Sequence, residues 1–286
     1  MIEVKNVSYT YMSGGPFETA ALKNMSLSLE DGEFIGLMGH TGSGKSTLVQ
    51  IIGGLEKPTE GSVVIDGQTL HSKECDMRAM RFKIGLVMQY PEYQLFEETV
   101  FRDIAFGPTN MGLSEQEIRD RVELAADLAG VKRELLEKSP FELSGGQKRR
   151  VAIAGVIVTK PEILVLDEPA AGLDPLGKQE IMQLLHKIHK EWCKTVIIVS
   201  HDMDEISENC TRAAVFSDGK VVREASPAEL FLDYATLSGL GLDIPFTAKV
   251  TELLEQKGVK LRCDFTSADF VRKTLEYAGL GGREDA

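Results

Sequence analysis

The chain has 286 residues, of which 43% are hydrophobic, and its formal net charge is −12. This length allows one large α/β domain with a small appendage, and the acidic balance argues against binding to nucleic acid or to an anionic membrane surface. It contains no run of 18 uncharged apolar residues, and its first residues lack the apolar stretch of a secretion signal. We therefore expect a soluble, cytoplasmic protein that reaches a membrane only through a protein partner.

The first part of the chain predicts β structure around a glycine-rich loop. Residues 1–30 alternate apolar and polar side chains in two stretches, which indicates an antiparallel β layer. A strand at 33–38 then leads into GHTGSGKS and an apolar helix, and SVVIDGQTL predicts another β segment. From 90 to 160 the pattern becomes helical, and Ser114 with Glu117 has the spacing of a capping box at a helix start.

Two continuous apolar runs, at 163–167 and 195–200, predict parallel strands buried on both faces, with a helix at 177–191 between them. AAVFSDGKVV predicts a hairpin, after which glycine and proline interrupt short helices. We therefore predict an α/β fold with a mixed sheet core, an antiparallel β layer and a helical subdomain at about 90–160. The main domain would span 1–230, and a C-terminal extension would span 231–286.

The glycine-rich loop has the pattern G-x-x-x-x-G-K-[ST] between a predicted strand and a predicted helix, which is the context that this phosphate-binding motif requires. Its backbone N–H groups would surround a phosphate, Lys45 would reach the β and γ phosphates, and Ser46 could bind Mg²⁺. The candidate nucleotide-binding residues of this loop are Gly39, His40, Thr41, Gly42, Ser43, Gly44, Lys45, Ser46 and Thr47.

Two acids follow the apolar run at 163–167. Asp167 ends the run, and a carboxylate at the carboxyl end of a buried strand beside a phosphate loop can hold Mg²⁺. Glu168 is the next residue, and we expect it to polarise an attacking water. The alternative is that both acids merely begin a loop.

The pentapeptide LSGGQ precedes another predicted helix. Ser144, Gly145 and Gly146 would cap that helix and leave its first N–H groups and the positive end of its dipole open to an anion, and Gln147 completes the motif. Because the chain already has one phosphate loop, a second anion site is explained if it serves the nucleotide of a partner chain. The pentapeptide resembles the signature of ABC ATPases, in which two subunits close head to tail over two ATP molecules.

Further residues resemble that family in the expected order. Tyr11 resembles the aromatic that stacks on adenine, with Tyr9 as a rival candidate. Gln89 resembles the Q-loop glutamine, which is a catalytic and Mg²⁺-binding position, and His201 resembles the switch histidine. Asp174 ends a segment that resembles the nucleotide-contacting D-loop. The resemblance covers residues 1–225 and implies a P-loop ATPase of the ABC type that uses ATP and Mg²⁺.

The stretch that begins at Gln89, QYPEYQLFEETVFRDIAFGPTNMG, is similar to the ATPases of energy-coupling factor transporters, including the cobalt-type ones. These importers of vitamins or metal ions pair two ATPases, identical or paralogous, on the cytoplasmic face of the membrane. The pair drives a transmembrane coupling protein, which works with a membrane-embedded substrate-binding subunit. A soluble ABC ATPase that is not coupled to transport is the alternative.

That similarity has two further implications. Helices of the coupling protein would lie in a groove lined by aromatics, of which we expect Phe101 and Phe106 to be mostly buried. The extension at 231–286 would help the two ATPases to dimerise. The candidate groove aromatics are Tyr90, Tyr93, Phe96, Phe101 and Phe106.

Overall fold

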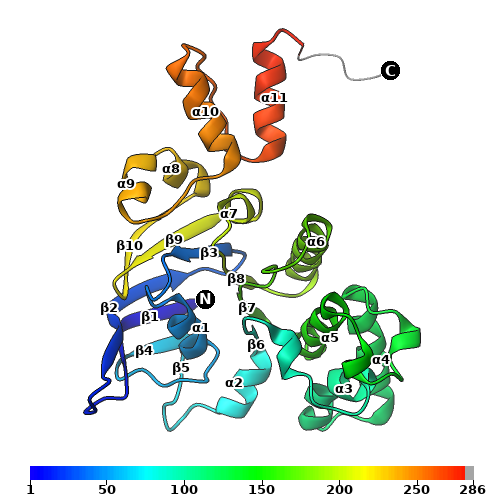
Figure 1. Ribbon diagram of the computed structural model, residues 1–286. Helices are drawn as coiled ribbons and strands as arrows, with labels where there is room; N and C mark the ends of the chain where they lie inside the picture. Colours follow the sequence, from blue (N-terminus) through cyan, green and yellow to red (C-terminus); the bar gives the residue numbers. More distant parts are fainter. Residues whose placement is uncertain (281–286) are drawn as a thin grey trace.

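The structure is a computed structural model, and it describes residues 1–280 (Figure 1). The strands are β1 (Ile2–Tyr11), β2 (Thr19–Leu29), β3 (Phe34–Gly39), β4 (Glu60–Ile65), β5 (Gln68–Thr69), β6 (Ile84–Val87), β7 (Ile163–Asp167), β8 (Thr195–Val199), β9 (Arg212–Ser217) and β10 (Lys220–Ala225). The α-helices are α1 (Lys45–Ile52), α2 (Met77–Lys83), α3 (Val100–Met111), α4 (Glu115–Leu128), α5 (Gly145–Ile157), α6 (Pro175–Glu191), α7 (Met203–Asn209), α8 (Pro227–Phe231), α9 (Tyr234–Gly239), α10 (Phe246–Gln256) and α11 (Ser267–Tyr277). Short 3₁₀ turns are η1 (Pro91–Gln94), η2 (Arg133–Leu135) and η3 (Pro140–Glu142).

A six-stranded sheet, in the order β10-β9-β3-β8-β7-β6, forms the centre of the molecule. Its neighbours from β9 to β6 pair in parallel, and β10 pairs antiparallel with β9. Every residue of β7 and β8 is buried, so the prediction of two buried parallel strands is confirmed. The predicted hairpin is β9–β10, and Asp218 and Gly219 both have positive φ at its turn, as a tight hairpin requires.

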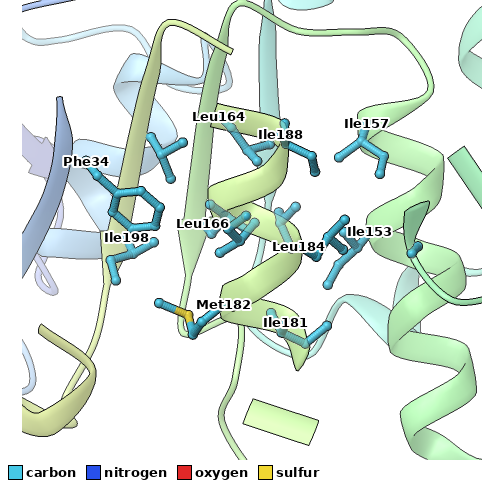
Figure 2. Close-up of a cluster of buried hydrophobic side chains, with 14 of the residues drawn as sticks. Phe34, Ile153, Ile157, Leu164, Leu166, Ile181, Met182, Leu184, Ile188 and Ile198 are labelled. Atoms are coloured by element: carbon cyan, nitrogen blue, oxygen red, sulfur yellow. The ribbon is translucent and has the colours of Figure 1, made fainter. Parts of the chain in front are cut away.

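Side chains of the parallel strands alternate between two separate cores, which explains why their sequences are apolar throughout. In β7, Leu164 and Leu166 face one core, whereas Ile163 and Val165 face the other. Figure 2 shows Leu164 and Leu166 lying toward side chains of α6 and α5. Burial on both faces therefore holds the central strands in one register.

The second core lies between the central sheet and a four-stranded antiparallel sheet, in the order β2-β1-β4-β5. The predicted antiparallel β layer is therefore confirmed. Helix α1 contributes its apolar side chains to the same core, including Leu48 and Ile52, which are fully buried. This packing fixes α1 against the end of β3, and so it fixes the loop between them.

Helices α3, α4 and α5 form the predicted helical insert (Figure 1). The capping box of Ser114 and Glu117 is present at the start of α4, as expected. Phe101 is partly buried against the core, but the expected burial of Phe106 is wrong, since 49% of its surface is exposed. Ile104 and Pro108 lie on the buried face of α3. Phe106 is two residues from each of them, so it lies on the opposite side of the helix.

The C-terminal segment is joined to the main core. Helix α8 extends across the predicted boundary at 230/231, and its Leu230 and Phe231 belong to the same apolar cluster as Ile244 and Phe265. In contrast, α11 has no buried residue. The shared core therefore reaches as far as residue 265, and α11 projects from it (Figure 1). Residues 281–286 of the predicted extension lie outside the described part of the chain.

A buried ion pair joins the helical insert to the segment after β6. Arg149 of α5 is only 3% exposed, and its Nε and Nη2 donate to the two carboxylate oxygens of Glu92 in η1 at 3.1 and 2.8 Å. Its Nη1 donates to the backbone oxygen of Ala171. One guanidinium thus joins η1, α5 and the loop before α6.

The variant Arg149→Met should lower the free energy of unfolding by about 3 kcal/mol or more, because Glu92 would keep its charge in a largely buried position without a cation. Urea denaturation checks this result. The matched control is Arg102→Met, whose partner Glu98 is exposed and whose loss should cost about 0.5 kcal/mol or less. Equal losses in the two variants would show that burial does not strengthen the Arg149 pair.

Candidate functional site

The predicted phosphate loop connects β3, which ends at Gly39, to α1, which begins at Lys45. Gly39 and Gly44 have φ of 155° and 105°. A Cβ on Gly39 would lie 2.5 Å from the backbone oxygen of Phe216, and one on Gly44 would lie 2.6 Å from that of Ala21. These two glycines are therefore required by the close approach of β9 and β2 to the loop as well as by its backbone conformation.

The ammonium of Lys45 lies inside this loop. Only 5% of the residue is exposed, and Nζ donates to the backbone oxygens of Gly39 at 2.7 Å and His40 at 3.0 Å. Burial lowers the pKa of Lys45, although the charges of Asp167 and Glu168 oppose that shift. No carboxylate of residues 1–280 forms an ion pair with this ammonium, so its nearest partners are neutral oxygens. A buried positive charge of this kind favours an anion in the loop.

Asp167 at the end of β7 is the buried carboxylate of the site. It is 4% exposed and accepts a hydrogen bond from Ser46, the second residue of α1. Burial raises the pKa of Asp167, and the Ser46 hydrogen bond opposes that shift. A hydroxyl and a carboxylate are hard oxygen ligands that suit Mg²⁺, which binds few protein groups and keeps water and phosphate in its other positions. The donor set therefore fits this ion.

Glu168 contacts two other predicted catalytic residues, one with each carboxylate oxygen. Its Oε1 lies 3.1 Å from Nε2 of His201, and its Oε2 accepts a hydrogen bond of 2.9 Å from Nε2 of Gln89. The three residues follow the neighbouring strands β7, β8 and β6, whose carboxyl ends meet at one edge of the sheet. Glu168 has a left-handed backbone with φ of 50°, a strained conformation that is found at functional sites.

Lys45, Ser46, Gln89, Glu168 and His201 line one cleft of about 400 Å³, whereas Asp167 is buried and is not among its lining residues. Tyr11 lies in its wall, 38% exposed, with its hydroxyl 3.1 Å from that of Thr47. The rival candidate Tyr9 is part-buried and donates to Glu56 at 2.6 Å, and this hydrogen bond raises the pKa of Tyr9 to about 12. The cleft is lined by Tyr11, Thr19, Ala20, Ala21, Thr41, Gly42, Gly44, Lys45, Ser46, Thr47, Gln89, Glu168, Val199 and His201.

Sequence reasoning missed the part of this wall that β2 supplies, at Thr19 to Ala21. These residues have no motif. Their position follows from the pairing of β1 with β2, in which Thr19 lies opposite Tyr11. The sequence could have indicated them only if a hairpin had been predicted with Tyr11 paired to Thr19.

The LSGGQ residues do not line this cleft. Ser144 caps α5, its hydroxyl accepts from the N–H of Gln147, and Oε1 of Gln147 accepts from the N–H of Ser144 at 3.0 Å. A Cβ on Gly145 or Gly146 would meet no atom within 4 Å, so packing inside the chain does not require glycine at either position. This helix end is open to a molecule outside the chain.

Asp174 also lies outside the lining of the cleft. It is the N-cap of α6, where its Oδ1 accepts from the N–H of Gly177 at 2.7 Å. Its position within one chain is therefore explained by helix capping, and a contact with nucleotide would require a second chain.

Comparison with known proteins agrees with this geometry. The model of the family described as "ABC transporter" matches residues 22–171, a segment that contains the phosphate loop, Gln89, the LSGGQ residues, Asp167 and Glu168. The chain belongs to the ABC transporter family. Within this family it is 49% identical to an energy-coupling factor transporter ATP-binding protein of Caldanaerobacter subterraneus over 96% of both chains. It is 46% identical to that of Clostridium acetobutylicum, again over 96% of both.

Solved ABC ATPases have the same fold. One is cbiO1 of Clostridium perfringens, described as part of an ABC transporter complex, with 39% identity, a TM-score of 0.73 and coverage of 88% of this chain and 98% of that one. Another is a dimeric ATP-binding cassette in a post-hydrolysis state bound to ADP and Pi, with 36% identity, a TM-score of 0.72 and coverage of 79% and 99%. The predicted ABC-type α/β fold is thus confirmed. Within residues 1–280 of this ABC ATPase, no helix is long and apolar enough to cross a membrane.

The variant Lys45→Ala should abolish tight ATP binding, because it removes the buried cation that would face the β and γ phosphates. Isothermal titration calorimetry with ATP checks this result, and circular dichroism confirms that the variant is folded. Lys5→Ala is the matched control, since Lys5 is exposed and, among residues 1–280, forms an ion pair with Glu3 alone. Equal ATP affinity in the two variants would contradict the role of Lys45.

Proposed function

We propose that this ABC ATPase hydrolyses ATP in the cleft at the phosphate loop and that this hydrolysis powers an energy-coupling factor importer. The observation that carries the proposal is the contact of Glu168 with both His201 and Gln89, since all three line the same cleft as the buried ammonium of Lys45. A base and a phosphate-binding cation thereby lie on one surface, as hydrolysis requires.

Each residue then has a definite task. Lys45 and the loop N–H groups hold the β and γ phosphates, and Tyr11 stacks on adenine. Ser46, Asp167 and Gln89 would hold Mg²⁺, which would supply positive charge beside the phosphates. Glu168 accepts a proton from the attacking water, and the hydrogen bond from Gln89 and the contact with His201 fix the direction of its carboxylate.

The site is completed by a second chain. The N-terminal end of α5 has open glycines and a positive dipole end, yet it does not line the cleft of its own chain. We infer that Ser144, Gly145, Gly146 and Gln147 bind the γ-phosphate held by the partner and that Asp174 contacts the same interface. The dimeric cassette described as bound to ADP and Pi supports this arrangement.

Transport requires membrane partners, and exposed aromatics support a docking surface for them. Tyr90, Tyr93, Phe96 and Phe106 are 45%, 83%, 59% and 49% exposed, and the rings of Phe96 and Phe106 pack edge to face at 5.1 Å. Phe106 also lines a groove of about 530 Å³ between α2, α3 and α5. We propose that a transmembrane coupling protein docks here at the cytoplasmic face and links the ATPase pair to a membrane-embedded substrate-binding subunit.

The C-terminal extension supports a second contact between the paired ATPases. Helix α11 exposes Val271 and Leu275, which are one turn apart on the same face, and none of its residues is buried in its own chain. We propose that this helix pairs with that of the other ATPase, which is either an identical chain or a paralogue.

The composite site leads to a prediction with two variants. Glu168→Gln should retain ATP binding while hydrolysis slows about a hundredfold or more, since the amide keeps the shape of the side chain but cannot accept the proton. The variant should therefore accumulate as an ATP-bound dimer. Adding Ser144→Arg should abolish that dimer but not ATP binding by the monomer, because the substitution removes the cap at the surface that faces the partner's phosphate.

Size-exclusion chromatography with ATP, with and without Ser144→Arg, provides the measurement. Ser139→Arg is the control, since Ser139 caps only the short turn η3. If the Glu168→Gln, Ser144→Arg chain dimerises as well as Glu168→Gln alone, the LSGGQ residues do not act across the interface.

The role of α11 leads to a separate prediction. Leu275→Asp should weaken association in the absence of nucleotide by about tenfold, because a charge would enter an apolar contact. Sedimentation velocity measures the change, and the fold should persist because Leu275 is exposed. Lys273→Asp places an acid on another face of the same helix and should have little effect. Equal association of the two variants would argue against pairing through this face.

A further inference from the structure

Helix α7 directly follows the switch histidine. It begins at Met203, and its N-cap is Asp202, the residue after His201. Oδ1 of Asp202 accepts from the N–H groups of Asp204 and Glu205 at 3.1 and 3.3 Å. Because the cap and the histidine are adjacent in the chain, a displacement of α7 would also displace His201.

The outer side of α7 is bonded to the C-terminal extension at three points. Oδ1 of Asp204 accepts from the N–H of Phe246, the first residue of α10, at 2.9 Å. The hydroxyl of Ser207, a buried residue, donates to the backbone oxygen of Phe265 at 2.9 Å. Oε1 of Glu208 accepts from the N–H of Ser267, the first residue of α11, at 2.6 Å. The contacts connect α7 to the starts of α10 and α11.

The side chains of Asp204 and Glu208 stabilise the extension rather than α7 itself. The N-cap of α10 is Pro245, which offers no side-chain cap, so Asp204 satisfies an N–H group that would otherwise lack a partner within its helix. Glu208 lies in the last turn of α7, where the dipole of its own helix disfavours a carboxylate. At the N-terminus of α11 the same carboxylate is favoured.

The other side of α7 is bonded to the sheet and to α6. Lys178 of α6 donates to Oδ2 of Asp202 at 2.7 Å, and the hydroxyl of Ser200 donates to Glu205 at 2.7 Å. A cleft of about 440 Å³ is lined by Glu168 and His201 together with Asp243 and Lys249 of the extension. Met203, Asp204 and Glu205 of α7 line the same cleft, so α7 lies beside both the extension and the catalytic pair.

We propose that the C-terminal extension positions His201 for hydrolysis through α7, with Asp204 and Glu208 as positioning residues. The inference rests on the proposed function of His201 beside Glu168. The relevant contact between those two residues is a single one of 3.1 Å, so a small displacement of α7 breaks it. Pairing of the extension with that of a second ATPase thereby changes the hydrolysis rate without touching the nucleotide.

The test uses the full-length chain and steady-state ATP hydrolysis. Asp204→Ala lowers kcat about tenfold, as expected when a catalytic group is misplaced, while KM for ATP stays unchanged because Asp204 does not line the nucleotide cleft. Asp204→Asn keeps the acceptor oxygen and keeps kcat near that of the unmodified chain. Arg272→Ala is the control, since its ion pairs in the described part of the chain are with acids of its own helix α11. A kcat for Asp204→Ala equal to that of Arg272→Ala overturns the inference.

A second background separates positioning from general stability. In His201→Ala, the further change Asp204→Ala leaves kcat as it is, because the group that it positions has been removed; a merely structural role lowers kcat in both backgrounds and overturns the inference. If Asp204→Ala does not fold, the exposed Glu208→Ala replaces it in the same measurements. Full activity of His201→Ala alone would instead show that the proposed function of the site is wrong.

Discussion

The burial of the central parallel strands on both faces is the constraint on which the site depends. Strands β3, β8, β7 and β6 alternate their side chains between two cores, so none of them can slip by one residue without exchanging the two apolar sets. Since these strands run in the same direction, the residues that follow them meet at one edge. The phosphate loop, Glu168, His201 and Gln89 lie together for this reason, although up to 162 residues separate them in the chain.

Charge at that edge is organised by burial. Lys45 is surrounded by neutral oxygens, and Asp167 is buried beside a hydroxyl. Both groups therefore favour the binding of an ion of the opposite charge. Glu168 differs from them because both of its oxygens contact polar side chains and it lines the cleft. Lys45 and Asp167 are thus buried, whereas Glu168, the base in our proposal, lies where water can reach it.

Two sets of contacts connect this edge of the sheet to other parts of the molecule. Arg149 joins α5, which carries the LSGGQ residues, to η1 after Gln89 and to the loop before α6. Helix α7 joins the loop of His201 to the extension. These contacts are hydrogen bonds and ion pairs, and each connects the site to a surface where we propose that a partner binds. Binding at either surface can therefore affect the position of residues in the site.

The sequence by itself determined the elements whose signals are local. The strand–loop–helix around Lys45, the capping box at Ser114 and the hairpin at Asp218 depend on residues within a few positions of one another, and the structure contains all three. The family resemblance likewise rested on short motifs, and it agreed with the comparisons.

Only the tertiary structure decided features that depend on distant neighbours. The choice of Tyr11 over Tyr9 as a cleft residue depended on the path of β1 past the phosphate loop. The exposure of Phe106 followed from which face of α3 meets the core, and an apolar residue does not reveal that face. Residues up to 265 pack into the main core, but the change in composition near 230 predicted a domain boundary there. Composition reflects local preference, whereas burial depends on elements that are far apart in the chain.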